Sequence, residues 1–256
     1  MIDTNVYLER WPFRRLTADD SEQLVATLKA LGITQAWAGS FDGLFHRDIG
    51  GVNERLSQKC RESDDGFLIP FGTVNPTLPD WEDDLRRIDE EFQMPGIRLH
   101  PAYHGYMLDD SRFAELLRFA NDRSLAVQLV VGMEDERTQH TLHRIPSVDL
   151  SPLKAVLKEV GGTQIMILNA FRSVSVAQAV ELTLDTSIHF DIAMLEGIAG
   201  AGKLIESLPA ERIVFGTHAP LFYPDSAILK LIESGLPEAI LLKLKAENAA
   251  NWLANR

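Results

Sequence analysis

The sequence predicts a single (β/α)₈ barrel, and three observations lead to this fold class. Short β-branched or apolar runs alternate with amphipathic segments along the whole chain, which is typical of βαβ units that build a parallel sheet. Successive runs begin about thirty residues apart, the length of one such unit. The chain has 256 residues, enough for eight units to close into one barrel. We therefore expect one domain that covers residues 1–256.

The expected strands are short runs rich in apolar and β-branched residues. Turn-forming or polar residues bound them, and continuous apolar runs of this kind are typical of strands that are buried on both faces. They cover Ile2–Leu8, Gln35–Ala38, Phe67–Thr73, Gly96–His100, Ala126–Val131, Gln164–Leu168, Ser187–Ile192 and Arg212–Thr217.

Helices are expected between the strands because apolar residues recur there at helical spacing. The first helix has Leu24, Leu28 and Leu31 on one face and ends at Gly32. Stripes of this kind usually face the core. The later ones are Trp81, Leu85, Ile88 and Phe92, then Phe113, Leu116, Leu117 and Ala120, and then Leu153, Val156, Leu157 and Val160.

A doubly wound open sheet is the alternative architecture. That fold needs a glycine-rich phosphate-binding turn after an early strand. Here the first strand runs into Glu9-Arg10-Trp11-Pro12 instead. The missing turn and the eight units together favour a closed barrel.

Composition and charge limit the partners of the chain. Its 37 acidic and 25 basic residues give a formal charge of −12, which repels nucleic acids and anionic membranes. No apolar stretch is long enough to span a bilayer, and no basic stretch leads into an apolar run at the N-terminus. We expect a soluble cytoplasmic protein whose partner is a small molecule, and the sequence leaves open whether it forms a homo-oligomer.

Polar residues occupy the C-terminal halves of the expected strands, where a barrel carries its active site. Asp3, Asn5 and Tyr7 share one face of the first strand because side chains alternate along a strand. Such a row needs hydrogen-bond partners or a ligand, since unpaired polar groups are costly to bury. We expect it to form a ring with polar residues that lie in or directly after the other strands: His100, Gln128, Asn169, Asp191 and His218.

Five segments carry a recognisable pattern from the first strand to the last helix. They are Ile2-Asp3-Thr4-Asn5-Val6-Tyr7, Gly96-Ile97-Arg98-Leu99-His100-Pro101, Phe190-Asp191-Ile192, Val214-Phe215-Gly216-Thr217-His218-Ala219-Pro220 and Glu247-Asn248-Ala249-Ala250. In this order they resemble the amidohydrolase-related (amidohydrolase 2) family. The resemblance implies a TIM barrel with hydrolase, decarboxylase or lactonase chemistry on small carboxylic or cyclic compounds.

The resemblance also implies a set of metal ligands, and this chain departs from it at every position. The family carries a His-x-His pair on its first strand, a His at the end of the fifth, a His after the sixth and an Asp after the eighth, which together hold a divalent cation. The matching positions here are Asn5 and Tyr7, Val130, Asn169 and His218. Asn and Tyr are poor zinc ligands and Val cannot bind a metal. We therefore expect no metal and no other cofactor at the usual place.

The first functional hypothesis is a hydrolase or decarboxylase-type enzyme that acts without that metal on a small polar or carboxylate-bearing molecule. His218 would be the general acid or base, oriented by Asp191 or another carboxylate. Tyr7 would donate a hydrogen bond to a developing oxyanion, and His100 completes the expected catalytic group. The residues expected to bind substrate are Asn5, Arg98, His104, Gln128, Asn169 and Trp11.

Arg98 has two interpretations at this stage. It shares a strand face with His100, so it could hold a substrate carboxylate through two parallel hydrogen bonds. It could equally form an internal ion pair with an acid such as Asp3.

Two other functions remain open. The barrel could bind a small polar ligand without catalysis, because neutral polar residues replace most of the metal ligands. Alternatively, a divalent cation such as zinc could be held by His100, His104, Asp191 and His218, since three protein ligands and an open position suffice. Convergence of His218, Tyr7 and His100 on one open cavity would favour an enzyme, whereas separate bonds to backbone would favour binding.

The segment Glu134–Asp149 is the one long polar loop and follows the fifth strand. A loop in this place is expected to be either a lid over the barrel mouth or a solvated charged segment. Trp11 and Phe13 follow the first strand and are expected to form one wall of the pocket.

Overall fold

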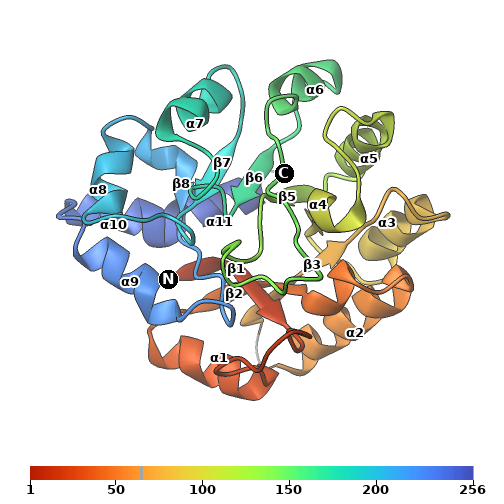
Figure 1. The fold of residues 1–256 in the computed structure, drawn as a ribbon, viewed down its shortest axis with the longest axis horizontal. Helices are drawn as coiled ribbons and strands as arrows, with labels where there is room; N and C mark the ends of the chain where they lie inside the picture. Colours follow the sequence, from red (N-terminus) through yellow and green to blue (C-terminus); the bar gives the residue numbers. More distant parts are fainter. Residues whose placement is uncertain (64–65, 256) are drawn as a thin grey trace.

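The computed structural model describes residues 1–63 and 66–255. Its strands form one parallel eight-stranded sheet in chain order, and Figure 1 shows them at the centre of a ring of helices. The predicted TIM barrel is thereby confirmed. The strands are β1 (Ile2–Leu8), β2 (Gln35–Ser40), β3 (Leu68–Thr73), β4 (Gly96–Leu99), β5 (Ala126–Val130), β6 (Ile165–Leu168), β7 (His189–Asp191) and β8 (Ile213–Val214).

The helices bury the faces that the apolar spacing predicts. Leu24 and Leu28 of the first helix are buried, and the Asp20 side chain caps this helix by accepting from the N–H groups of Glu22 and Gln23. In the described ranges no helix combines the length and the apolar character that crossing a membrane requires. The helices are α1 (Ser21–Ala30), α2 (Ile49–Glu62), α3 (Trp81–Glu90), α4 (Pro101–His104), α5 (Ser111–Asp122), α6 (Leu153–Glu159), α7 (Val176–Thr183), α8 (Gly200–Ile205), α9 (Pro224–Ile232), α10 (Glu238–Leu242) and α11 (Asn248–Ala254), with shorter turns η1 (Phe41–Leu44), η2 (Ala210–Arg212) and η3 (Lys243–Glu247).

The last two strands are shorter than the sequence predicts. β7 and β8 were expected over 187–192 and 212–217, but they end at Asp191 and Val214. After β8 the chain leaves the strand conformation: His218 has a φ of 59°, and the Thr217 N–H donates to Asp3 Oδ1 at 3.0 Å. The end of β8 therefore serves to place His218 rather than to extend the sheet.

Backbone hydrogen bonds join the two ends of the sheet and close the barrel. The Thr4 N–H donates to Phe215 O at 3.0 Å, the His218 N–H to Asn5 O at 2.8 Å and the Tyr7 N–H to Ala219 O at 2.9 Å. These bonds bring the inward row of β1 next to the residues that follow β8.

Aromatic side chains fill much of the barrel interior. Trp37 stacks on Phe71 with ring centroids 5.2 Å apart, and Tyr7 stacks on Phe41 at 4.9 Å. Arg98 connects the two stacks, because its guanidinium lies 4.7 Å from the Tyr7 ring centroid and donates to Trp37 O. The interior is thus a packed core rather than a channel.

Candidate functional site

Asp3 fastens the first strand to the end of the last one. Its carboxylate accepts hydrogen bonds from the Thr217 hydroxyl at 2.6 Å, the Thr217 N–H and the Asn5 N–H at 3.1 Å. Burial raises the pKa of Asp3 to about 7, since desolvation disfavours the charged form. All its partners belong to the scaffold, so Asp3 positions its neighbours and does not face a ligand.

Asn5, Asn169 and Asp191 form one buried hydrogen-bond network from β1 and the ends of β6 and β7. The Asn5 side-chain amide donates to Asp191 Oδ2 at 2.7 Å and to Asn169 Oδ1 at 2.8 Å. The Asn169 backbone N–H donates to Asp191 Oδ1 at 2.8 Å. Burial raises the pKa of Asp191 to about 6, although the hydrogen bonds from Asn5 and Asn169 lower this pKa in part. The position next to this network must be Gly216, because a Cβ there would lie 2.8 Å from Asp191 Oδ2.

His218 is fully buried and held from both sides of its ring. Its Nε2 lies 2.7 Å from Met133 O, and because a carbonyl only accepts, Nε2 carries the hydrogen. Nδ1 is then the acceptor, and Asn169 Nδ2 donates to it at 3.2 Å. Burial lowers the pKa of His218 to about 4, so the imidazole is neutral near pH 7. Its backbone and that of Asn169 both have positive φ, 59° and 61°, a strained conformation for a non-glycine residue such as His.

Tyr7 and His100 are paired with each other inside the barrel. The Tyr7 hydroxyl lies 2.9 Å from His100 Nε2, and both residues are essentially unexposed. Burial lowers the pKa of His100 and raises that of Tyr7 to about 12. His104 on α4 donates through Nε2 to Gly43 O at 2.9 Å. The Nδ1 atoms of both histidines are buried without a partner among the described residues.

Arg98 neither faces a substrate carboxylate nor forms an ion pair within the described residues, so both interpretations made from the sequence are wrong. Its guanidinium donates to Gln128 Oε1 at 2.8 Å and to three backbone oxygens, those of Val6 at 2.7 Å, Thr4 at 3.1 Å and Trp37 at 2.9 Å. Among the ion pairs of the described residues none includes Arg98. The side chain is fully buried, so it holds the barrel interior together and is not directed at a substrate carboxylate. Gln128, which also donates to Thr4 O, belongs to the same internal set.

The long polar segment after β5 covers the barrel mouth. Residues 131–152 contain no helix or strand, and Figure 1 shows this segment in green across the middle of the ring of helices. It contacts the loop after β1 in two places: Glu134 pairs with Arg14, and His143 stacks on Phe13 with ring centroids 5.0 Å apart. Trp11, buried beneath, packs on Phe41 at 5.1 Å. This arrangement agrees with the lid interpretation rather than with a solvated loop.

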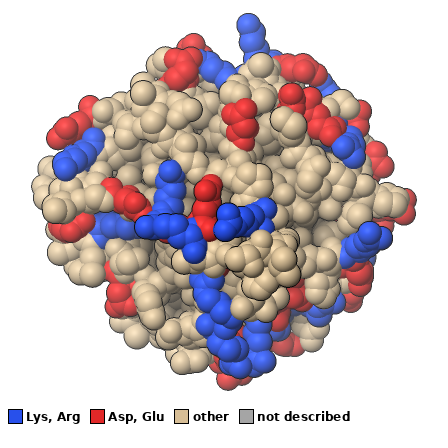
Figure 2. Space-filling view, viewed as in Figure 1, with Lys and Arg blue, Asp and Glu red and all other residues tan. Residues whose placement is uncertain are grey.

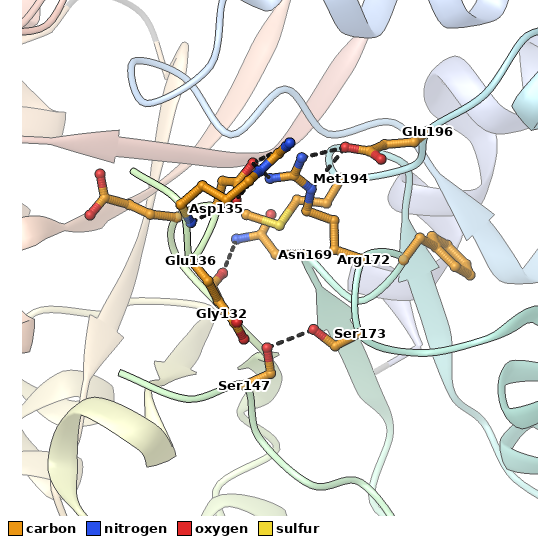
Figure 3. Close-up of a pocket in the computed structure, with 12 residues that line it drawn as sticks. Gly132, Asp135, Glu136, Ser147, Asn169, Arg172, Ser173, Met194 and Glu196 are labelled. Carbon is orange, nitrogen blue, oxygen red and sulfur yellow. Dashed lines mark hydrogen bonds and ion pairs between the residues drawn. The ribbon is translucent and has the colours of Figure 1, made fainter. Parts of the chain in front are cut away.

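A pocket of about 410 Å³ opens at the mouth beside this lid. Figure 3 shows Asn169 at one side of it, with its amide bonded to Gly132 O. Of the residues proposed from the sequence as catalytic or substrate-binding, Asn169 alone is among those that line this pocket. The other lining residues come from the loops after β5, β6 and β7, namely Gly132, Glu134, Asp135, Glu136, Arg137, Ser147, Phe171, Arg172, Ser173, Met194 and Glu196.

Charged groups at the pocket rim are paired with one another. Asp135 accepts from Arg137 at 2.5 Å and from Arg172 at 2.8 Å, and Arg172 also pairs with Glu196 at 2.5 Å. These bonds keep the pKa of Asp135 well below its usual range. Figure 2 shows acidic and basic side chains side by side across the middle of this face. The sequence indicated the loop, but no periodic pattern pointed to Arg172 or Ser173.

The positions that the resemblance assigns to metal ligands do not fit a divalent cation. The atom between Asp191 Oδ2 and Asn169 Oδ1 is Asn5 Nδ2, which carries hydrogens and has no lone pair to offer a metal. A cation there would meet the amide hydrogens and would compete with two existing hydrogen bonds. Tyr7 is occupied by His100, and Val130 has no ligand atom. The amide NH₂ of Asn5 supplies the electropositive group to which the surrounding oxygens bond.

The alternative metal site at His100, His104, Asp191 and His218 does not fit a divalent cation either. Nε2 of His100 is bonded to Tyr7, Nε2 of His104 to Gly43 O, and Nε2 of His218 to Met133 O. Within residues 1–63 and 66–255, no group of three or more His, Cys, Asp or Glu could hold a metal ion. The set of His100, His104, Asp191 and His218 is therefore a number of separate hydrogen-bonded side chains and not one ligand set.

Because His218 is buried in its neutral form, we expect the free energy of unfolding to fall in acid. The pKa of His218 in the folded protein, about 4, lies below the ordinary value of 6.5. The stabilisation from the neutral imidazole is therefore complete above pH 6.5 and is lost as the pH falls from 6.5 to 4. Between pH 7 and pH 4 the wild type should lose about 3 kcal/mol more unfolding free energy than His218→Gln. Urea unfolding of both proteins at the two pH values measures this, and equal losses would contradict the burial of a neutral imidazole.

Similar proteins exist among known families and solved structures. A family model described as Amidohydrolase matches residues 7–254, whereas the search of curated proteins found no match. A 2,6-dihydroxybenzoate decarboxylase from Rhizobium is similar in structure, with a TM-score of 0.73 and 13% identity over 99% of this chain and 98% of that chain. A 5-carboxyvanillate decarboxylase from Sphingomonas paucimobilis has a TM-score of 0.76 and 12% identity over 99% and 98% of the two chains.

A third similar structure contains a metal. It is a dihydroxybenzoic acid decarboxylase from Polaromonas with bound manganese and the inhibitor 2-nitroresorcinol, with a TM-score of 0.75 and 12% identity over 100% of this chain and 97% of that chain. At such identities the likeness concerns the fold. Manganese therefore occurs on this fold, and the local side chains decide whether a given chain binds it.

Proposed function

Because the chain belongs to the amidohydrolase family, we propose that it is an enzyme of the hydrolase or decarboxylase type that acts on a small polar molecule at the barrel mouth without a bound metal. One observation carries the proposal. Two side chains of the buried network donate to consecutive backbone carbonyls at the start of the lid: Asn169 Nδ2 to Gly132 O at 2.9 Å and His218 Nε2 to Met133 O at 2.7 Å.

These two carbonyls occupy the place of a substrate oxygen. If the lid segment moves, Asn169 Nδ2 and His218 Nε2 lose their acceptors, while Asn5 and Asp191 still hold Asn169 from the opposite side. Two fixed N–H donors then point to one region of the pocket. Fixed donors of this kind stabilise the negative charge that develops on a carbonyl oxygen, which is the role a metal has elsewhere.

The acid or base role of His218 follows from the same movement. In the covered state burial holds the pKa of His218 near 4. Water that enters when Met133 is displaced relieves this desolvation and returns the pKa toward its ordinary value, where imidazole exchanges protons near neutral pH. His218 would then transfer a proton. Asn169 would position it, and Asp191, which does not contact His218, would act only by holding Asn169.

Charge at the pocket supports an uncharged substrate. The lining contains four acidic residues and two basic ones, and Arg14, which pairs with Glu134, adds a third positive charge. The excess of one negative charge disfavours a carboxylate. Arg98, the residue expected to hold a carboxylate, is used inside the barrel. We therefore favour hydrolysis of a neutral amide, ester or lactone over decarboxylation.

The remaining expectations stay predictions. The proposed enzyme uses no cofactor, because Asn5 occupies the centre of the network with N–H groups. The single-domain organisation over residues 1–256, the cytoplasmic location and the lack of nucleic-acid and membrane partners rest on the sequence alone.

A non-catalytic ligand-binding barrel is the second candidate, and a specific observation favours it. His218, Tyr7 and His100 are essentially unexposed, and each is bonded inside the protein rather than to a shared open cavity. This arrangement suits binding at the lid pocket without proton transfer.

Turnover of a compound panel distinguishes the two candidates. The panel contains small amides, esters and lactones, together with 2,6-dihydroxybenzoate and 5-carboxyvanillate as carboxylates, and nuclear magnetic resonance follows their loss. We expect turnover of an uncharged member and at least a tenfold lower kcat/KM in Asn169→Ala, because one donor to the oxyanion is lost. The control is Asn251→Ala, at an exposed position. Binding without turnover of any member would support the ligand-binding barrel instead.

A further inference from the structure

We infer that the substrate carries an apolar tail of several carbons, which lies in a second chamber beyond the lid pocket. This inference rests on the proposed function, because it extends the same site. The second chamber has a volume of about 500 Å³ and lies between the end of the lid segment and α7. Ser147 and Ser173 line both chambers. The two cavities are therefore neighbours, separated by these side chains.

The boundary between the chambers is a single hydrogen bond between two hydroxyls. Ser147 Oγ and Ser173 Oγ lie 2.6 Å apart, and Figure 3 shows this contact at one edge of the lid pocket. Both side chains belong to loops, after β5 and after β6, and not to the barrel strands. Each hydroxyl can rotate to another acceptor or to water, so a chain of methylene groups can pass between them at the cost of one weak bond.

The second chamber differs from the first in chemical character. Its walls include Val148, Leu150, Val174 and Leu182, of which Leu150, Val174 and Leu182 are buried and Val148 is half-buried. In contrast, charged residues dominate the lid pocket. A ligand that fills both chambers must therefore have a polar head and an apolar tail.

The polar groups at the rim of the second chamber are already partnered. Lys154 donates to Glu181 Oε1 at 3.0 Å, and Asp149 accepts from the Ser151 hydroxyl at 2.8 Å. They offer little to a second polar group, whereas the half-buried Val148 and the remaining exposed edges of the apolar walls gain from any contact that removes them from water. Because the polar groups are partnered and the walls are apolar, the chamber favours an alkyl or aryl tail over another charged group.

A chain-length series tests the inference directly. Primary alkyl amides from acetamide to octanamide supply an uncharged head and a tail of increasing length, and isothermal titration calorimetry gives Kd for each. Once the tail passes Ser147 and Ser173, we expect Kd to fall about threefold to fourfold for each added methylene. The matching alkyl carboxylates form a second series, and we expect the same dependence on length with weaker binding throughout.

Variants of the chamber locate the effect. Val148→Asp places a charge on an apolar wall and should abolish the gain with length while acetamide binding is retained. Ser151→Trp fills the chamber from an exposed position and should have the same effect without threatening the fold. The control is Val176→Asp, an exposed valine of α7 outside the chamber lining, which should leave the whole series unchanged.

The outcomes separate this inference from the proposed function. If short amides bind and Kd does not change with length, the tail chamber is wrong while the head pocket stands. If the gain with length persists in both Val148→Asp and Ser151→Trp, the tail lies elsewhere and the inference is overturned. If no amide or carboxylate of any length binds, the proposed function fails, and the inference fails with it.

Discussion

Replacing His218 with glutamine is expected to lower kcat/KM by about 100-fold or more on whichever panel member the wild type converts. The side-chain amide of glutamine can still donate a hydrogen bond toward Met133 O. It therefore replaces the His218 donor in the lid contact and preserves the fold. It cannot take up or release a proton near neutral pH, and general acid or base catalysis contributes about 100-fold to 10,000-fold. Initial rates over a range of substrate concentrations measure the effect.

The control for this variant is His46→Gln. His46 is half-exposed and lies in the loop after η1, away from the network. We expect its kcat/KM to match that of the wild type. Equal turnover by His218→Gln and the wild type would show that His218 transfers no proton in the reaction.

Replacing Asn5 with aspartate is expected to destabilise the fold by about 3 kcal/mol or more at pH 8. The substitution exchanges a donor for a carboxylate at 2.7 Å from Asp191 Oδ2, and two buried like charges without a partner are costly. Because the new pair of carboxylates resembles a cation site, added Mn²⁺ should restore part of the loss. Urea unfolding with and without Mn²⁺ measures both effects.

Asn251→Asp is the matched control, since it makes the same change at an exposed position of α11. Its unfolding free energy should lie within about 0.5 kcal/mol of that of the wild type, with no response to Mn²⁺. An Asn5→Asp protein as stable as the wild type would show that the Asn5 amide is not a required donor in the network.

The sequence predicts the barrel well because period and spacing are local properties. β1 has the predicted bounds, and every other predicted strand overlaps the observed one. The larger errors are at the end of β2, which is two residues longer than predicted, at both ends of β7, and at the end of β8. After β8 side chains decide the backbone: the bonds from Thr217 to Asp3 and the positive φ of His218 replace the ladder. Such a competition depends on contacts between residues more than 200 positions apart, which no local pattern reveals.

The network at the strand ends can also be predicted from the sequence. Alternation on β1 placed Asn5 inward, and the C-terminal ends of parallel strands meet, so the contact of Asn5 with Asn169 and Asp191 follows from topology. The hydrogen-bond partners of Arg98 could not be predicted in this way, because the sequence does not show which acceptors surround a buried guanidinium. The pocket itself is formed by loop residues such as Arg172 and Ser173, whose positions depend on turns without a periodic signal.

Asn5 lies at the centre of the buried network and donates from its amide in two directions. The oxygens of Asp191 and Asn169 that surround it accept hydrogen bonds, and an amide NH₂ satisfies them at no net charge. This leaves His218 and Asn169 as the polar groups directed toward the lid. The proposed reaction therefore depends on hydrogen-bond donors that are fixed before the substrate arrives.

Metal content is the most direct test of this metal-independent site. The protein is purified without added cation, incubated with excess Mn²⁺ or Zn²⁺, passed over a desalting column and analysed by inductively coupled plasma mass spectrometry. The proposal predicts less than about 0.1 metal ion per chain and the same turnover with and without a chelator, because Asn5 presents hydrogens where a ligand is required. About one ion per chain, lost in His218→Gln together with the activity, would contradict it.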